Sequence, residues 1–160
     1  MSDRQRAQTD SGMNLCLANK SHRFDRSITL QAGARKSGVD VVKGSRFLPG
    51  GYSKDISFVR RTGNRILLSI VNLIWSTNYT DLCYGFMGFN RNGLKEISPY
   101  LSSQNFEIET EICIKAKKKG LKVLEIPSVE YARRYGKSNL KTFWDGFLIF
   151  KEILRELFEI

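Results

Sequence analysis

Segments typical of strands alternate with segments typical of helices from residue 39 onward. Val39–Lys43 and Leu121–Ile126 are short, apolar and rich in β-branched residues, which predicts buried strands. Between them lie Ser57–Trp75 and Glu107–Lys119, where apolar residues recur at helical spacing. This alternation predicts an α/β fold in which helices flank a sheet.

The two ends of the chain differ from this middle part. Residues 1–38 are polar and lack a clear period, which favours an irregular or non-native lead-in. Residues 39–139 carry the alternating elements. Residues 140–160 predict an amphipathic helix with a heavy aromatic load that includes Phe143 and Trp144. Such a helix is either part of the core or lies at a membrane surface, and we favour the membrane surface.

The charge balance favours an anionic partner. The 160 residues contain 26 Lys and Arg against 16 Asp and Glu, for a net charge of +10. Nucleic acid, a nucleotide or a phospholipid head group would each fit this charge. One histidine, His22, and three scattered cysteines provide no material for a histidine-based metal site or a Ser-His-Asp triad. An odd cysteine count also argues against a disulfide framework.

Two sets of residues are candidates for binding phosphate. Gly44, Ser45 and Arg46 follow the first predicted strand, and ligands bind at the carboxyl ends of strands in α/β sheets. A turn with an Arg in solvent is an equally good interpretation. Arg61 and Arg65 lie one helical turn apart, so they either form a solvated face or hold a phosphate together.

A third candidate is the basic loop before the last helix. Gly136, Lys137 and Ser138 resemble the end of a P-loop, but Tyr131 stands where that motif needs its first glycine. We therefore reject a Walker A site. A basic, glycine-bearing loop that leads into a helix remains suitable for an anionic group.

Carboxylates gather at two points in the middle of the chain. Asp81 precedes an aromatic bend that contains glycine, and Glu107, Glu109 and Glu111 begin the second helix. Acids at a helix start also suit the helix dipole, so they need no catalytic role. Glu107 and Glu111 are one turn apart while Glu109 points elsewhere, so all three cannot face one substrate.

Six motifs in this order resemble the C-terminal half of the family 2 inverting glycosyltransferases, in particular those related to dolichol-phosphate mannose synthase. Over residues 39–156 they read V-V-K-G-S-R-F-L-P-G-G, R-R-T-G-N-R, T-D-L-C-Y-G-F, F-E-I-E-T-E, L-K-V-L-E-I-P and R-R-Y-G-K-S-N-L. The resemblance implies a partial Rossmann-like sheet of GT-A type. It also implies a nucleotide-sugar donor, a polyprenyl-phosphate or other glycan or lipid acceptor, and a place at the cytoplasmic face of the membrane. Nucleic acid is not an expected partner.

The resemblance also implies roles for individual residues. Gly44, Ser45 and Arg46 match a segment beside the donor phosphates, and Asp81 matches an acid near the acceptor. Glu109 matches the position of the catalytic base, with Glu107 as the second choice.

The basic loop matches a mobile segment that closes over the site in this family. Its matching residues are Arg134, Gly136, Lys137 and Ser138.

The family binds a divalent metal, Mg or Mn, through an Asp-x-Asp loop. Residues 1–38 contain no such sequence. We therefore expect an acceptor-side half from a truncated chain, without metal ligands of its own. The alternatives are a non-catalytic, membrane-associated or interaction domain, and a nucleic-acid-binding module that uses aromatic residues near basic ones.

Overall fold

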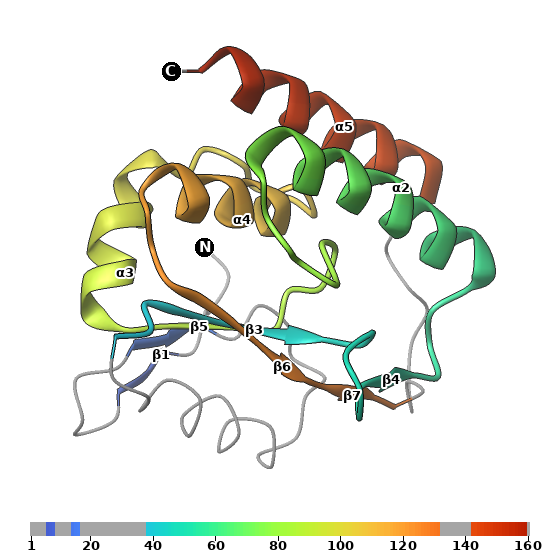
Figure 1. Ribbon diagram of the computed structural model, residues 1–160, viewed down its shortest axis with the longest axis horizontal. Coiled ribbons are helices and arrows are strands. Elements are labelled where there is room, and N and C mark those ends of the chain that lie inside the picture. The colour runs from blue at the N-terminus through green and yellow to red at the C-terminus, as the bar shows by residue number, and fades with distance from the viewer. Residues whose placement is uncertain (1–5, 9–13, 17–37, 132–141, 160) are drawn as a thin grey trace.

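The computed structural model describes residues 6–8, 14–16, 38–131 and 142–159 and has the predicted α/β class (Figure 1). Its main sheet has the strand order β1-β2-β5-β3-β6. These strands are β1 (Arg6–Gln8), β2 (Asn14–Cys16), β5 (Met87–Phe89), β3 (Val41–Ser45) and β6 (Val123–Pro127). β3 and β6 run parallel, whereas the other neighbours are antiparallel. The sheet is therefore mixed, as in a partial Rossmann-like fold.

The described helices gather on one side of this sheet (Figure 1). They are α2 (Phe58–Trp75), α3 (Arg91–Ile97), α4 (Ile108–Lys118) and α5 (Thr142–Phe158), with a 3-10 turn at Ser98–Tyr100. A second, two-stranded parallel sheet pairs β4 (Tyr52–Ser53) with β7 (Val129–Glu130). The predicted helices are thus all present, and α2 and α4 begin and end within one residue of their expected positions.

Local signals in the sequence explain where the helices begin. Ser57 precedes α2, and its side chain accepts a hydrogen bond from the backbone N–H of Arg60. Asn90 precedes α3 in the same way and accepts from the N–H of Gly93 at 2.6 Å. Each cap satisfies a backbone donor that the first turn of a helix leaves without a partner.

The first strand differs from its prediction at both ends. β3 begins at Val41 and extends through Gly44 and Ser45, because its pairing with β6 continues to Ser45 opposite Pro127. Gly44 and Ser45 are therefore buried strand residues and not the strand-end turn that we expected. A Cβ atom on Gly44 would lie 2.7 Å from Cδ1 of Phe86, so the strand needs a glycine there.

The helices and the sheet share one hydrophobic core. Val41 and Met87 contribute from the sheet, and Val71, Ile114 and Ile153 contribute from α2, α4 and α5. All five side chains are almost completely buried. The last helix therefore packs into the core on one side, as predicted by the interpretation that it is part of the core.

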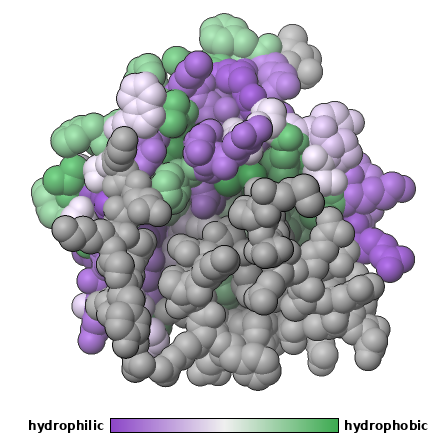
Figure 2. Space-filling model, turned by 180° about the vertical axis from the view of Figure 1, so that it is seen from behind, coloured by the Kyte–Doolittle hydropathy of each residue, from purple (hydrophilic) through white to green (hydrophobic). Residues whose placement is uncertain are grey.

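Its other side remains exposed, as does part of α2. We call the exposed large apolar residues of these two helices the apolar rim. They are Phe58, Val59, Ile66, Leu73 and Ile74 of α2 and Phe143, Trp144, Phe147, Phe150, Leu154, Leu157 and Phe158 of α5. Figure 2 shows hydrophobic side chains protruding at the top of the molecule, where α5 lies. Among the described helices, none combines the length and the apolar character needed to cross a membrane.

Substitution by alanine should have opposite effects on the free energy of unfolding at two helical glycines. A Cβ atom on Gly93 would lie 2.5 Å from the backbone oxygen of Asp40, whereas one on Gly63 would meet nothing within 4 Å. Gly93→Ala should lower the free energy of unfolding by about 1–3 kcal/mol through this clash. Gly63→Ala should raise it by about 0.5–1 kcal/mol, because alanine favours the helix. Urea denaturation measures both, and equal effects would contradict the packing at Gly93.

Candidate functional site

A pocket opens between α2, α5, the start of α4 and the turn that precedes β5. α2 contributes one wall with Val59, Arg60, Gly63, Asn64 and Leu67. The first two turns of α5 contribute the facing wall with Thr142, Asp145, Gly146 and Ile149. The lining mixes apolar residues with polar and charged ones, and the polar and charged groups determine what the pocket can hold.

Arg46 forms one end of this pocket and is fixed by a buried ion pair. Its Nε and Nη2 donate to the two carboxylate oxygens of Asp81 at 2.7 and 3.0 Å. Nη2 also donates to the carbonyl of Cys83 at 3.2 Å, and Nη1 donates to Glu130 at 3.3 Å. The guanidinium lies over the ring of Tyr84, 4.6 Å from its centroid. Four of its five N–H groups are thus engaged by described residues, and one N–H of Nη1 remains for a ligand.

A second set of buried charges supports the turn around Asp81. Lys43 is fully buried, donates to the backbone carbonyl of Asp81, and lies 4.0 Å from Glu125. Glu125 accepts from both the N–H and the hydroxyl of Thr80 at 2.8 Å. Strands β3 and β6 supply these two residues, so their parallel pairing brings the charges to the turn.

Glu109 is one of four carboxylates that line the pocket, together with Asp55, Glu130 and Asp145. It lies in the first turn of α4, and burial raises the pKa of its carboxyl to about 7. The nearby positive charges of Lys43 and Arg46 act in the opposite direction but do not outweigh burial. A carboxyl that titrates near neutral pH can both accept and release a proton there.

The other two glutamates of the predicted trio lie elsewhere, as their helical spacing predicted. Glu111 is buried and accepts from the backbone N–H groups of Ser102 and Ser103, both at 2.9 Å. Glu107 is the N-cap residue of α4 and does not line the pocket. The helix thus presents only Glu109 to the pocket.

The remaining predicted residues are dispersed. Asp81 is fully buried and occupied by Arg46, and Gly44 and Ser45 lie inside β3 without lining the pocket. Ser45 instead shares a 2.6 Å hydrogen bond with the hydroxyl of Thr80. The predicted residues Arg134, Gly136, Lys137 and Ser138 lie outside the described residues.

The arginines of α2 contribute differently from our expectation. Arg61 and Arg65 are exposed and do not line the pocket, and Arg61 lies over the ring of Phe47. Arg60 lines the pocket, and its Nε donates to the hydroxyl of Thr142 in α5 at 3.1 Å. Helical geometry explains the difference, because adjacent residues on a helix point about 100° apart.

Sequence reasoning also missed Glu130, which lines the pocket from β7. It accepts from Arg46 and, at 2.6 Å, from the hydroxyl of Ser53. The signal that would have found it is an acid in a short strand directly after Pro127 and Ser128. Such a residue is a poor strand former unless a cation lies opposite.

One cysteine lines the pocket but is a poor nucleophile. Burial raises the pKa of Cys83 to about 12, so its thiol stays protonated at neutral pH. Covalent catalysis by Cys83 is therefore not supported.

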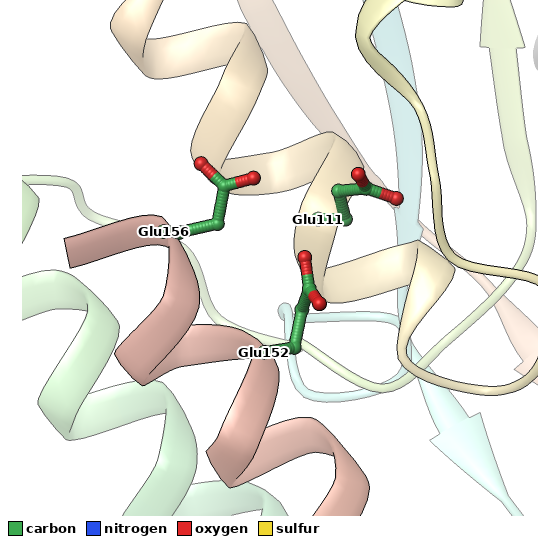
Figure 3. Close-up of side chains that lie close together, drawn as sticks. All are labelled: Glu111, Glu152 and Glu156. Atoms are coloured by element: carbon green, nitrogen blue, oxygen red, sulfur yellow. The ribbon is translucent and has the colours of Figure 1, made fainter. Parts of the chain in front are cut away.

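A cluster of three buried glutamates outside the pocket does not fit a metal. Glu111, Glu152 and Glu156 point toward one another from α4 and α5, with oxygens within 4.8 Å of one another (Figure 3). Cations already engage all three: Arg155 bonds Glu111 at 2.8 Å and Glu152 at 2.5 Å, and Lys115 bonds Glu156 at 2.7 Å. The cluster is an ion-pair network that holds α5 on α4. Among the described residues, no other group of acids, cysteines or histidines is placed to hold a divalent metal.

Comparison with known proteins shows that this chain is similar to glycosyltransferases. The chain is 33% identical over 122 residues to glycosyltransferase AglJ of Haloferax volcanii, a match that covers 74% of this chain and 38% of that protein. An uncharacterized protein of Methanocaldococcus jannaschii is also 33% identical over 122 residues, which cover 76% of this chain and 50% of that protein. No family model matches the chain.

A third relative is named for both its donor and its acceptor. It is the UDP-N-acetylglucosamine–dolichyl-phosphate N-acetylglucosaminyltransferase of Methanococcus voltae, 29% identical over 115 residues. That match covers 72% of this chain and 46% of the relative. The chain therefore spans half or less of the length of these relatives. Over about three-quarters of its own length it is similar to proteins named as glycosyltransferases, which confirms the resemblance found in its motifs.

The raised pKa of Glu109 predicts how the stability of the protein depends on pH. Between the ordinary value of 4.5 and the raised value of about 7, the folded protein keeps a proton that the unfolded chain has released. The contribution of Glu109 to the free energy of unfolding therefore falls as the pH rises through this range. Glu109→Gln removes this loss, so the variant should be more stable than the parent by about 1–3 kcal/mol at pH 8 and nearly equal to it below pH 4.5.

Urea denaturation at a series of pH values measures this difference. Glu96→Gln is the matched control, because Glu96 is exposed and does not line the pocket. A stability difference for Glu109→Gln that does not change between acid and alkaline pH would contradict the raised pKa.

Proposed function

We propose that this chain forms the acceptor-side part of an inverting glycosyltransferase that works at a membrane surface. The donor is a nucleotide-sugar, and the acceptor is a polyprenyl-phosphate or another lipid or glycan. The observation that carries the proposal is Glu109, a carboxyl whose pKa burial raises to about 7 in a pocket that Arg46 and Arg60 also line. The dolichyl-phosphate acceptor in the name of the Methanococcus voltae relative supports a lipid-phosphate acceptor.

The chemistry of inverting transfer fits the groups in this pocket. An oxygen of the acceptor attacks the anomeric carbon of the sugar, the bond from that carbon to the nucleotide diphosphate breaks, and the diphosphate leaves with the electron pair. Glu109 takes the proton when the acceptor oxygen is a hydroxyl. A phosphate acceptor is already ionised, since its second pKa is about 6, so it needs orientation more than a base.

Positive charge in the pocket suits phosphate groups on either substrate. Arg46 offers one N–H, and Arg60 lines the pocket wall that α2 contributes. Asp81 then acts through Arg46 by holding its guanidinium in place, and Gly44 and Ser45 act by fixing the strand that carries it. We assign Arg134, Gly136, Lys137 and Ser138 to a basic segment that closes over the phosphates, and Glu107 to a substitute for Glu109.

The metal that related transferases use has no fitting site among the described residues. The three clustered glutamates are neutralised by lysine and arginine, so they do not offer free ligands. We therefore derive no step of transfer through a metal.

The apolar rim supports a peripheral position at the membrane, on its cytoplasmic side. Phe143 and Trp144 are 85% and 60% exposed, and Phe58 at the start of α2 is 82% exposed. Arg61 and Arg65 lie on the same helix as Phe58 and are exposed too. Aromatic residues and arginines together suit an interface with anionic lipid head groups.

Turnover tests the proposed role of Glu109. In the full-length product of the gene, Glu109→Gln should lower kcat by about 10²–10⁴-fold when the acceptor is a hydroxyl, because general-base catalysis contributes about that much. Sugar transfer is measured with a labelled nucleotide-sugar, and Glu96→Gln is the control, because Glu96 is exposed and does not line the pocket. Unchanged turnover in Glu109→Gln with every acceptor would remove Glu109 from the mechanism.

Vesicle binding tests the proposed position at the membrane. The double variant Phe143→Ser, Trp144→Ser should lose most of its co-sedimentation with vesicles of phosphatidylglycerol and phosphatidylcholine, because it removes apolar area that the lipid would bury. Tyr100→Ser is the control, since Tyr100 is 51% exposed but lies outside the apolar rim. Equal binding by the double variant and the parent would exclude the rim as the membrane contact.

A further inference from the structure

Two asparagines of α2 hold the segment that follows the helix, although asparagine is a poor helix former. Asn72 uses its whole side chain for this purpose. Its Oδ1 accepts from the hydroxyl of Thr77 at 2.7 Å and from the N–H of Tyr79 at 3.0 Å. Its Nδ2 donates to the carbonyl of Tyr79 at 2.9 Å. Both ends of the Asn72 amide thus have partners within the chain.

Asn64 lies two helical turns earlier and uses only half of its side chain. Its Oδ1 accepts from the backbone N–H groups of Leu82 and Cys83 at 3.2 and 2.9 Å. These two donors identify the atom that faces them as the oxygen, because an NH₂ group there would find no acceptor. The Nδ2 atom on the other side is buried and has no hydrogen-bond partner among the residues that the structure describes.

An unpartnered buried donor is costly. Asn64 is only 3% exposed, and leaving such a group unsatisfied costs about 1–3 kcal/mol. Asn64 also lines the pocket, together with Glu109 and Arg60. Nδ2 is shielded from solvent in this structure, and a ligand oxygen that reaches it from the pocket would supply the missing acceptor.

We propose that Asn64 binds the acceptor substrate by donating a hydrogen bond from Nδ2 to one of its phosphate oxygens. This inference rests on the proposed function, because that function supplies the phosphate. Oδ1 keeps its bonds to Leu82 and Cys83, the two residues that follow Asp81. A single amide therefore joins the bound phosphate to the turn that fixes Arg46, and Asn64 is a positioning residue for the transfer.

The side-chain amide of Asn64 can be observed directly by NMR. The probe is farnesyl phosphate, titrated into uniformly ¹⁵N-labelled protein, and the resonance lost in Asn64→Asp assigns the Asn64 NH₂ group. A new hydrogen bond to phosphate should shift one of its protons downfield, whereas the NH₂ protons of Asn72 should stay in place. Inorganic phosphate, titrated in parallel, should shift the Asn64 amide only if phosphate binds there without the lipid chain.

Two variants measure the contribution of the donor. Asn64→Asp keeps an oxygen for Leu82 and Cys83 but loses the N–H, and it should weaken farnesyl phosphate binding by about tenfold or more, as hydrogen bonds to charged groups contribute about 1.5–3 kcal/mol. Asn72→Asp is the matched control on the same helix and should change affinity by less than about twofold. Because aspartate also adds a negative charge, the NMR shift in the unsubstituted protein is the decisive measurement.

The outcomes separate this inference from the proposed function. Farnesyl phosphate that saturates the backbone amide signals of Cys83 and Gly146, but leaves the Asn64 NH₂ signal unmoved, overturns the role of Asn64 and leaves the lipid-phosphate acceptor in place. No saturable change at any pocket residue overturns the lipid-phosphate acceptor, and the role of Asn64 with it.

Discussion

The buried ion pair between Arg46 and Asp81 is the interaction on which the site depends. Arg46 directly follows β3 and Asp81 lies in the turn that leads to β5, so the pair joins two segments 35 residues apart in sequence. Removing one partner of a buried pair leaves an uncompensated charge, which costs about 3–5 kcal/mol. The pair therefore fixes Arg46 at one end of the pocket and holds the turn that contains Asp81. Glu109 and Asn64 line the same pocket.

The fold followed from the sequence where local chemistry is enough to determine structure. Helical periodicity located α2 and α4. The starts of α2 and α3 are also set locally, because the caps Ser57 and Asn90 act on backbone groups three residues away. The ends of β3 were predicted wrongly. Its extension through Gly44 and Ser45 depends on pairing with β6, about 80 residues later, and no local pattern carries that information.

The site was partly predictable for the same reason. Helical spacing separated Glu109 from Glu107 and Glu111, since side chains two positions apart point to different sides of a helix. The partners of Arg46 depend instead on how distant segments meet. Glu130 contacts Arg46, and Lys43 contacts the Asp81 turn. Both contacts form only when segments far apart in the sequence come together.

Two glycines leave space in the pocket that a larger residue would fill. Gly63 and Gly146 line it from opposite helices, and a Cβ atom on either would meet nothing within 4 Å. Neither glycine has the positive φ that would forbid another residue. A single nucleotide change at either codon can therefore narrow the cavity without straining the backbone. Proteins that descend from one ancestral gene could in this way come to bind ligands of different size, while the Arg46–Asp81 pair and Glu109 stay unchanged.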